Sequence, residues 1–85
     1  MKELTIVENL CKGDIVTMVE VKPVWNSEIG SCEDVTFIHK FEIVKNNPKT
    51  YGCKYIEGAY KNSGFNWVKG YDLTKNTKKK YFIDD

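Results

Sequence analysis

The fold is decided by residues 34–57, DVTFIHKFEIVKNNPKTYGCKYIE, in which apolar and polar side chains alternate. Alternation over residues 34–45 and again over 50–57 predicts two β-strands that each have one buried face. Between them Asn46-Asn47-Pro48-Lys49 favours a turn, because asparagine suits its start and proline presets φ at the next position. The pattern predicts a hairpin whose first strand buries one row of side chains: Val35, Phe37, Phe41 and Ile43.

Residues before this hairpin contain one more clear strand. Asp14–Lys22 is rich in β-branched residues, follows a Lys-Gly-Asp turn signal, and ends at Pro23, which lacks a donor for the sheet. Residues 24–33 then predict a long loop or a splayed hairpin that carries Trp25. The opening segment, residues 4–10, is compatible with either a strand or one helical turn.

Residues after the hairpin predict two short strands, Phe65–Lys69 and Lys80–Ile83, with one helical turn over Gly70–Leu73. Five short strands joined by turns predict an all-β chain that forms a small closed or half-closed barrel. The 85 residues suffice for a single domain, residues 1–85, with its core at about residues 13–83.

Two short motifs resemble those of SH3-like small barrels. Gly13-Asp14-Ile15-Val16 resembles their opening strand, and Val44–Tyr51 is similar to the V-x-K-x-N-P-K-T hairpin of short SH3-like proteins of bacteria and phages. Trp67 and Leu73 fall where that pattern has a tryptophan and a leucine. The resemblance implies a five-stranded SH3-like barrel. Many relatives bind nucleic acid through a basic, aromatic face, and others bind peptides or proteins.

Cysteine usage and the terminal segments suggest a cytoplasmic protein, in the host cytoplasm if a phage encodes it. The three cysteines Cys11, Cys32 and Cys53 cannot all pair within the chain, which favours a reducing compartment. No apolar run is long enough for a membrane span, and residues 1–5 show no signal-peptide pattern. The cysteines and His39 lack the close pairs of zinc sites, so we expect no metal and no cofactor, although whether they converge in space stays open.

Charge is distributed unevenly along the chain, although its net value is only +1. Residues 1–42 carry −4 and residues 43–83 carry +7, and the basic part also holds eight of the eleven aromatic residues. All thirteen basic residues are lysine, as is typical of an AT-rich genome. This polarity supports two hypotheses about binding.

The first hypothesis is a protein partner recognised by the acidic segment. Carboxylates crowd a region with two large apolar residues, which suits docking on a basic protein surface with tryptophan as the anchor. A small phage- or mobile-element-type protein could in this way inhibit or modulate a host protein that acts on nucleic acid. The residues expected to bind are Trp25, Glu28, Ile29, Glu33 and Asp34.

The alternative hypothesis is weak, sequence-tolerant binding of DNA or RNA by the basic part. Lysines would neutralise phosphates and tyrosine rings would stack on bases. The absence of arginine argues against base-specific readout. The residues expected to bind nucleic acid are Lys45, Lys49, Tyr51, Lys54, Tyr55, Lys61 and Lys69.

Catalytic motifs are not found in the sequence. A Cys53–His39 dyad on neighbouring strands is conceivable, but no orienting third group or phosphate-binding loop accompanies it. We therefore expect a non-catalytic binding module without catalytic residues, present as a monomer or a weak homodimer.

Overall fold

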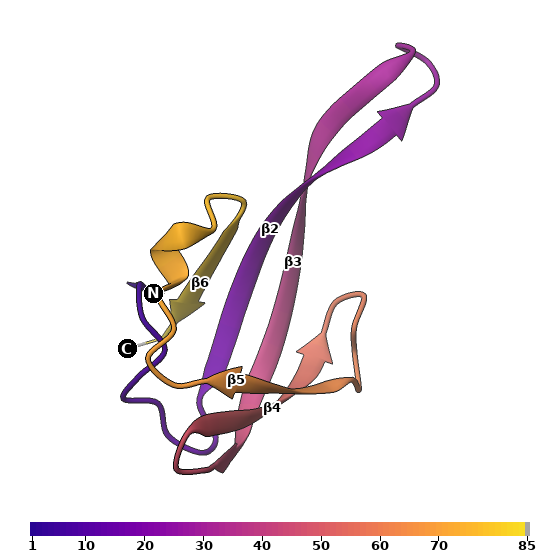
Figure 1. Ribbon diagram of the computed structural model, residues 1–85. Helices are drawn as coiled ribbons and strands as arrows, with labels where there is room; N and C mark the ends of the chain where they lie inside the picture. The colour runs from indigo at the N-terminus through magenta and orange to yellow at the C-terminus, as the bar shows by residue number, and fades with distance from the viewer. Residues whose placement is uncertain (85) are drawn as a thin grey trace.

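A computed structural model describes residues 1–84, which form one antiparallel sheet of six strands in the order β1-β6-β2-β3-β4-β5 (Figure 1). The all-β prediction is confirmed, but the predicted count of five strands is wrong because the chain start adds a strand against β6. A 3-10 helix, η1, replaces the helical turn expected slightly earlier. The bounds are β1 Lys2–Leu4, β2 Ile15–Asn26, β3 Ser31–Asn46, β4 Thr50–Glu57, β5 Gly64–Val68, η1 Leu73–Lys75 and β6 Lys79–Ile83.

Strand β2 does not end at Pro23, contrary to the sequence prediction. The N–H of Val21 donates to the carbonyl of Lys78 at 2.9 Å, so it points to the β6 side. Alternation along the strand points the nitrogen of Pro23 to the same side. At Pro23, β2 already extends beyond its last pair with β6, in which Glu20 faces Lys79. The missing donor therefore interrupts no ladder, and proline is tolerated as on an edge strand.

Residues 24–33 form a tight hairpin, so the prediction of a long first loop is wrong, and the alternative of a hairpin is right except that its strands stay paired and are not splayed. Trp25 pairs with Cys32 and Asn26 with Ser31, and the N–H of Gly30 donates to the Asn26 carbonyl at 2.9 Å. Gly30 has φ +66°, a value that favours glycine. The turn thus holds the two strands in register to their ends.

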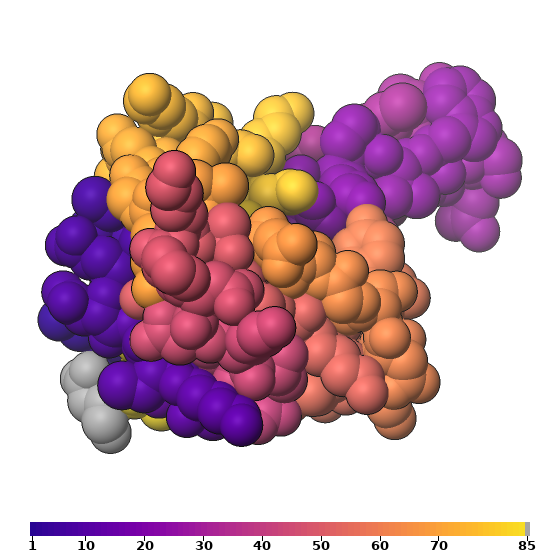
Figure 2. Space-filling view, turned by 60° about the horizontal axis from the view of Figure 1, so that its bottom comes forward, coloured from indigo at the N-terminus to yellow at the C-terminus, as the bar shows by residue number. Residues whose placement is uncertain are grey.

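The distal part of this hairpin, residues 22–36, projects from the rest of the molecule, and we call it the arm (Figures 1 and 2). Strand β2 pairs with β6 only as far as Glu20, and β3 pairs with β4 only from Lys40 onward. Beyond these points β2 and β3 pair only with each other. The chain accordingly extends 48 Å along one axis but 26 and 23 Å along the others.

The core lies in the body of the sheet, around Phe41. This ring is fully buried and meets four aromatic rings edge-on, with centroid separations of 5.0–6.4 Å. Phe37 is 36% exposed, so its predicted place in the core is wrong, because β3 has left β4 at that point. The buried apolar residues are Val7, Leu10, Val16, Met18, Phe41, Ile43, Tyr51, Cys53, Trp67 and Leu73, so the core begins before residue 13.

The sheet is open, because its edge strands β1 and β5 do not pair with each other. The segments that follow them are joined instead. Backbone hydrogen bonds link Val7 to Tyr71 and to Gly70, at 3.0 and 2.7 Å, and the N–H of Leu73 donates to Thr5 at 2.9 Å. These bonds hold the two sides of the sheet together at one end, without forming a continuous barrel.

Gly58, just after β4, should be the least replaceable glycine. Its φ is +103°, and a Cβ there would lie 2.5 Å from Nδ1 of the buried His39 and 3.1 Å from backbone atoms. We expect Gly58→Ala to lower the free energy of unfolding by about 1–3 kcal/mol more than Gly70→Ala does, because it adds overpacking to the strain of positive φ. Urea unfolding measures both values.

Gly70→Ala is the matched control. Gly70 also has a positive φ, +82°, but a Cβ there would meet nothing within 4 Å. Equal losses of stability in the two variants would contradict the close packing of Gly58 against His39.

Candidate functional site

The arm brings together all five residues expected to contact a protein partner. Trp25 is 64% exposed and Ile29, in the turn, is 60% exposed. Trp25 faces Cys32 across the hairpin and Pro23 faces Asp34, so Trp25 and Asp34 share one face. All three carboxylates are exposed: Glu28, Glu33 and Asp34. The arm therefore offers large apolar side chains within an acidic surface.

Asn26 orders the end of the arm. Its side-chain oxygen accepts a hydrogen bond from the N–H of Glu28 at 3.0 Å, and its Nδ2 donates to Oε1 of Glu33 at 3.3 Å. This side-chain turn and the hydrogen bond from Gly30 fix the backbone on both sides of Ile29. The exposed anchor residues are thus held on an ordered hairpin.

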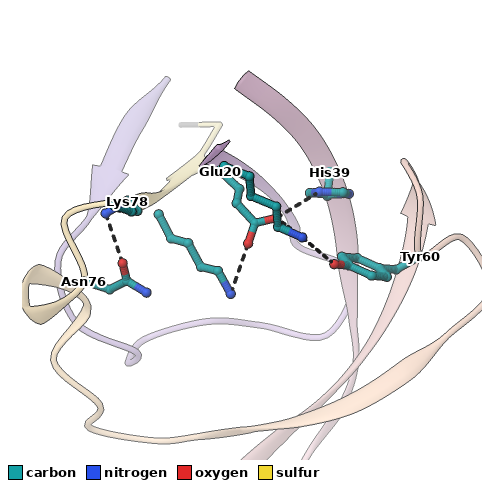
Figure 3. A network of polar contacts seen from close by, with 7 residues as sticks. Glu20, His39, Tyr60, Asn76 and Lys78 are labelled. Atoms are coloured by element: carbon teal, nitrogen blue, oxygen red, sulfur yellow. Dashed lines mark hydrogen bonds and ion pairs between the residues drawn. The ribbon is translucent and has the colours of Figure 1, made fainter. Parts of the chain in front are cut away.

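A buried carboxylate lies where the arm leaves the body. Glu20 is only 4% exposed and points inward between the strands (Figure 3). Its Oε1 lies 3.3 Å from Nζ of Lys22 and 3.6 Å from Nε2 of His39, and its Oε2 lies 3.3 Å from Nζ of Lys79. Because these partners belong to β2, β3 and β6, the Glu20 cluster ties three strands together at the base of the arm.

The two lysines keep Glu20 ionised. Burial alone raises the pKa of this carboxyl, but hydrogen bonds and charge attraction from Lys79 and Lys22 outweigh it, so the pKa lies below its ordinary value. The pKa of Lys22 is raised in turn, by its hydrogen bond to Tyr60 and by Glu20. The pairing therefore compensates the cost of burying a charge.

His39 connects the same cluster to the loop between β4 and β5. Its ring is 3% exposed and stacks on Tyr60 with a centroid separation of 4.9 Å. The hydroxyl of Tyr60 accepts a hydrogen bond from Lys22 at 3.2 Å. Neither ring nitrogen of His39 makes a hydrogen bond within residues 1–84. This histidine therefore packs the base of the arm.

Burial of Cys53 argues against the conceivable Cys53–His39 dyad. The thiol is 3% exposed, and burial raises its pKa to about 12, so a thiolate is scarce at neutral pH. Cys11 and Cys32 are exposed, in the loop before β2 and on the arm. Over the described residues, no three His, Cys, Asp or Glu side chains form a group that could hold a metal.

Residues expected to bind nucleic acid are only partly brought together. Tyr51 is 3% exposed, its hydroxyl accepts from the N–H of Leu10 at 3.1 Å, and Tyr55 packs on Phe41, so these rings are committed to the core. The backbone N–H of Lys69 donates to the carbonyl of Lys49, so these two lysines lie side by side. Nζ of Lys69 lies over the Tyr51 ring and donates a hydrogen bond to the side-chain oxygen of Asn46. Exposed lysines lie elsewhere on β3, β4 and the loop after it: Lys45, Lys54 and Lys61.

A pocket between β5 and β6 was not anticipated from the sequence. It has a volume of about 310 Å³, and the rings of Trp67 and Tyr81 lie within it at a centroid separation of 5.1 Å. Tyr71 and Val68 line it and are 53% and 57% exposed. Its remaining lining residues are Asn66, Leu73, Asn76 and Lys79. No sequence motif signals it, because its walls come from strands that are not neighbours in the sheet.

Glu20→Gln should destabilise the protein in a pH-dependent way. The native pKa lies below 4.5, so the ionised pairs stabilise the fold above that pH and lose their contribution as the pH falls. We expect a loss of about 1–3 kcal/mol in the free energy of unfolding at neutral pH. The loss should shrink in acid, as measured by urea unfolding across the pH range.

Glu57→Gln is the matched control for that experiment. Glu57 pairs with Lys40 at 3.5 Å, but both side chains are well exposed. Its loss should stay below about 1 kcal/mol. A Glu20→Gln loss as small as this, or one independent of pH, would contradict the role assigned to the cluster.

Thiol labelling should separate the three cysteines. In the folded protein, Cys11 and Cys32 should react with Ellman's reagent while Cys53 stays protected by burial and by its raised pKa. All three should react in denaturant. Labelling of Cys53 as fast as of Cys32 in the native state, detected by peptide mass spectrometry, would contradict the packing around β4.

Two features of the described residues stand out for binding, namely the acidic arm and the aromatic pocket, with the Glu20 cluster at the base of the arm. No helix within residues 1–84 has the length and apolar character needed to cross a membrane. Protein-family models, curated proteins and solved structures were each compared with the chain, and none of them matches it.

Proposed function

We propose that the protein is a non-catalytic binding module whose arm docks on a basic surface of a protein partner. The observation that carries this proposal is Trp25, a large apolar side chain that is 64% exposed on a projecting hairpin. Tryptophan is among the residues most often found to dominate interface energies. No packing against the body of the molecule accounts for a tryptophan at this position, because the arm projects away from it.

The charges of the arm indicate the chemistry of the partner. Glu28, Glu33 and Asp34 are exposed around the apolar anchors, and Lys22 is the only lysine in the arm. A positively charged surface would be attracted to this acidic surface, which speeds association and selects against acidic proteins. Nucleic-acid-binding proteins carry such basic surfaces, so a modulator of one of them, encoded by a phage or another mobile element, fits the arm well.

Rigidity at the base of the arm supports a docking role. The Glu20 cluster links β2 to β6, and the stack of His39 on Tyr60 links β3 to the β4–β5 loop. A segment that is ordered before binding loses less conformational entropy on association. The arm is therefore suited to present Trp25 in one orientation.

The body is proposed to be an SH3-like barrel that serves as the scaffold for the arm. In support, the segments following β1 and β5 are joined by backbone hydrogen bonds and by a bridge between Ile6 and Asp72. Such contacts bring the two edges of a curled sheet together at one end. The function is assigned to the arm, since the same scaffold can carry many activities.

Trp25→Ala should weaken partner binding strongly and leave the fold intact. Nuclease-treated bacterial lysate is passed over the immobilised protein, a captured protein is identified and purified, and its Kd is measured by calorimetry. We expect a partner with a basic surface and a loss of affinity of about 30-fold or more in the variant. Circular dichroism checks that the variant is folded.

Val44→Ala is the matched control, because Val44 is also exposed, at 39%, but lies at the end of β3 opposite the arm. It should bind the partner as the wild type does. Equal binding by Trp25→Ala and the wild type would contradict the proposal. Salt-sensitive binding of labelled DNA at low ionic strength, unaffected by Trp25→Ala, would favour the nucleic-acid alternative through the lysines.

A further inference from the structure

We propose that two copies of this chain exchange arms, each arm docking in the β5–β6 pocket of the other copy. This inference goes beyond the proposed function, because the occupant is a second copy and the receiving surface is the pocket. The arm carries apolar side chains that stay exposed among residues 1–84. The pocket carries aromatic and aliphatic side chains that are open to solvent.

The pocket matches the apolar anchor of the arm. Trp67 and Tyr81 form an aromatic pair in it, and the exposed surfaces of Val68 and Tyr71 lie at its opening. An indole ring packed there would cover apolar surface on both partners. A volume of about 310 Å³ can take a large side chain such as Trp25.

Charge complementarity favours the arm as the occupant. Residues 22–36 carry three carboxylates and one lysine. Residues 66–80, which supply most of the pocket, carry five lysines and a single carboxylate, Asp72. Lys75 and Lys78 are exposed on either side of the lining residue Asn76. An acidic arm and a basic pocket on one chain attract each other between copies.

Free strand edges are available on both surfaces. The N–H of Lys69 donates to Lys49 on the β4 side, so alternation points the backbone groups of Asn66 to the free edge of β5. On the arm, no strand within residues 1–84 pairs with the outer edge of β3 before Lys40. Exposed edges of this kind accept an additional strand, which would position the arm along the pocket.

Symmetry closes the assembly at two copies. Lys79 lines the pocket and also contacts Glu20 at the base of the arm, so the pocket lies near that base. When two arms lie antiparallel, the end of each therefore approaches the base of the other. The same two surfaces are used twice around a two-fold axis, which gives a dimer instead of an open chain of molecules.

Sedimentation equilibrium over a wide concentration range tests the proposal. The average mass should rise from 9.8 kDa towards twice that value, and high salt should weaken the association. Charge reversal on the arm (Glu28→Lys with Glu33→Lys) and near the pocket (Lys75→Glu with Lys78→Glu) should each weaken the homodimer by about 30-fold or more. Mixing the two variants should restore association, because in the mixed dimer each arm meets a pocket of opposite charge.

Lys12→Glu is the control for the change in charge, since Lys12 is exposed in the loop before β2, at the end of that strand opposite the arm. It should dimerise as the wild type does. A chain that stays monomeric throughout, or a dimer that neither reversal affects, would overturn the proposal. Val68→Asp separates the two proposals: it should block the pocket and the dimer while capture of a basic partner by the arm continues.

Discussion

The structure depends on the continuous register between β2 and β3. Residues pair without a shift from Ile15 with Glu42 to Asn26 with Ser31, although only the first part of this ladder has neighbouring strands. The body contributes the core, and the remainder of the same ladder extends beyond it as the arm. Because the register is uninterrupted, the orientation of the arm is set by the twist of the strands that also build the core.

Where the ladder leaves the body, its inward-facing row changes from apolar to polar. Val16 and Met18 are buried in the core, but the next inward residue is Glu20. A carboxylate at this depth requires cations within reach, and Lys22 and Lys79 provide them from two strands. The resulting cluster marks the end of the core and stiffens the base of the arm. One buried charge therefore both limits the hydrophobic interior and fixes the projecting segment.

Much of the sheet could be predicted from alternation, because the period of two reports which face of a strand is buried. It identified Thr50–Glu57 with the observed bounds and placed Phe41 and Ile43 in the core. The predicted end of β2 at Pro23 is wrong, because the missing donor of a proline interrupts a sheet only where another strand lies alongside. It also treated Tyr51 as a surface ring, although a small core needs large side chains.

The candidate surfaces differ in how far the sequence could reveal them. The residues of the arm are near neighbours along the chain, so their acidic and apolar character was visible before their geometry. The pocket joins Trp67 to Tyr81 across strands at different places in the sheet, and only the curvature of the sheet brings them together. The uneven charge of the sequence thus becomes a spatial polarity, with an acidic arm and a basic pocket near its base. Under the two proposals together, a partner of the arm would compete with the lysine-rich pocket of a second copy, and this competition would favour partners whose surface is more basic or more apolar than the pocket.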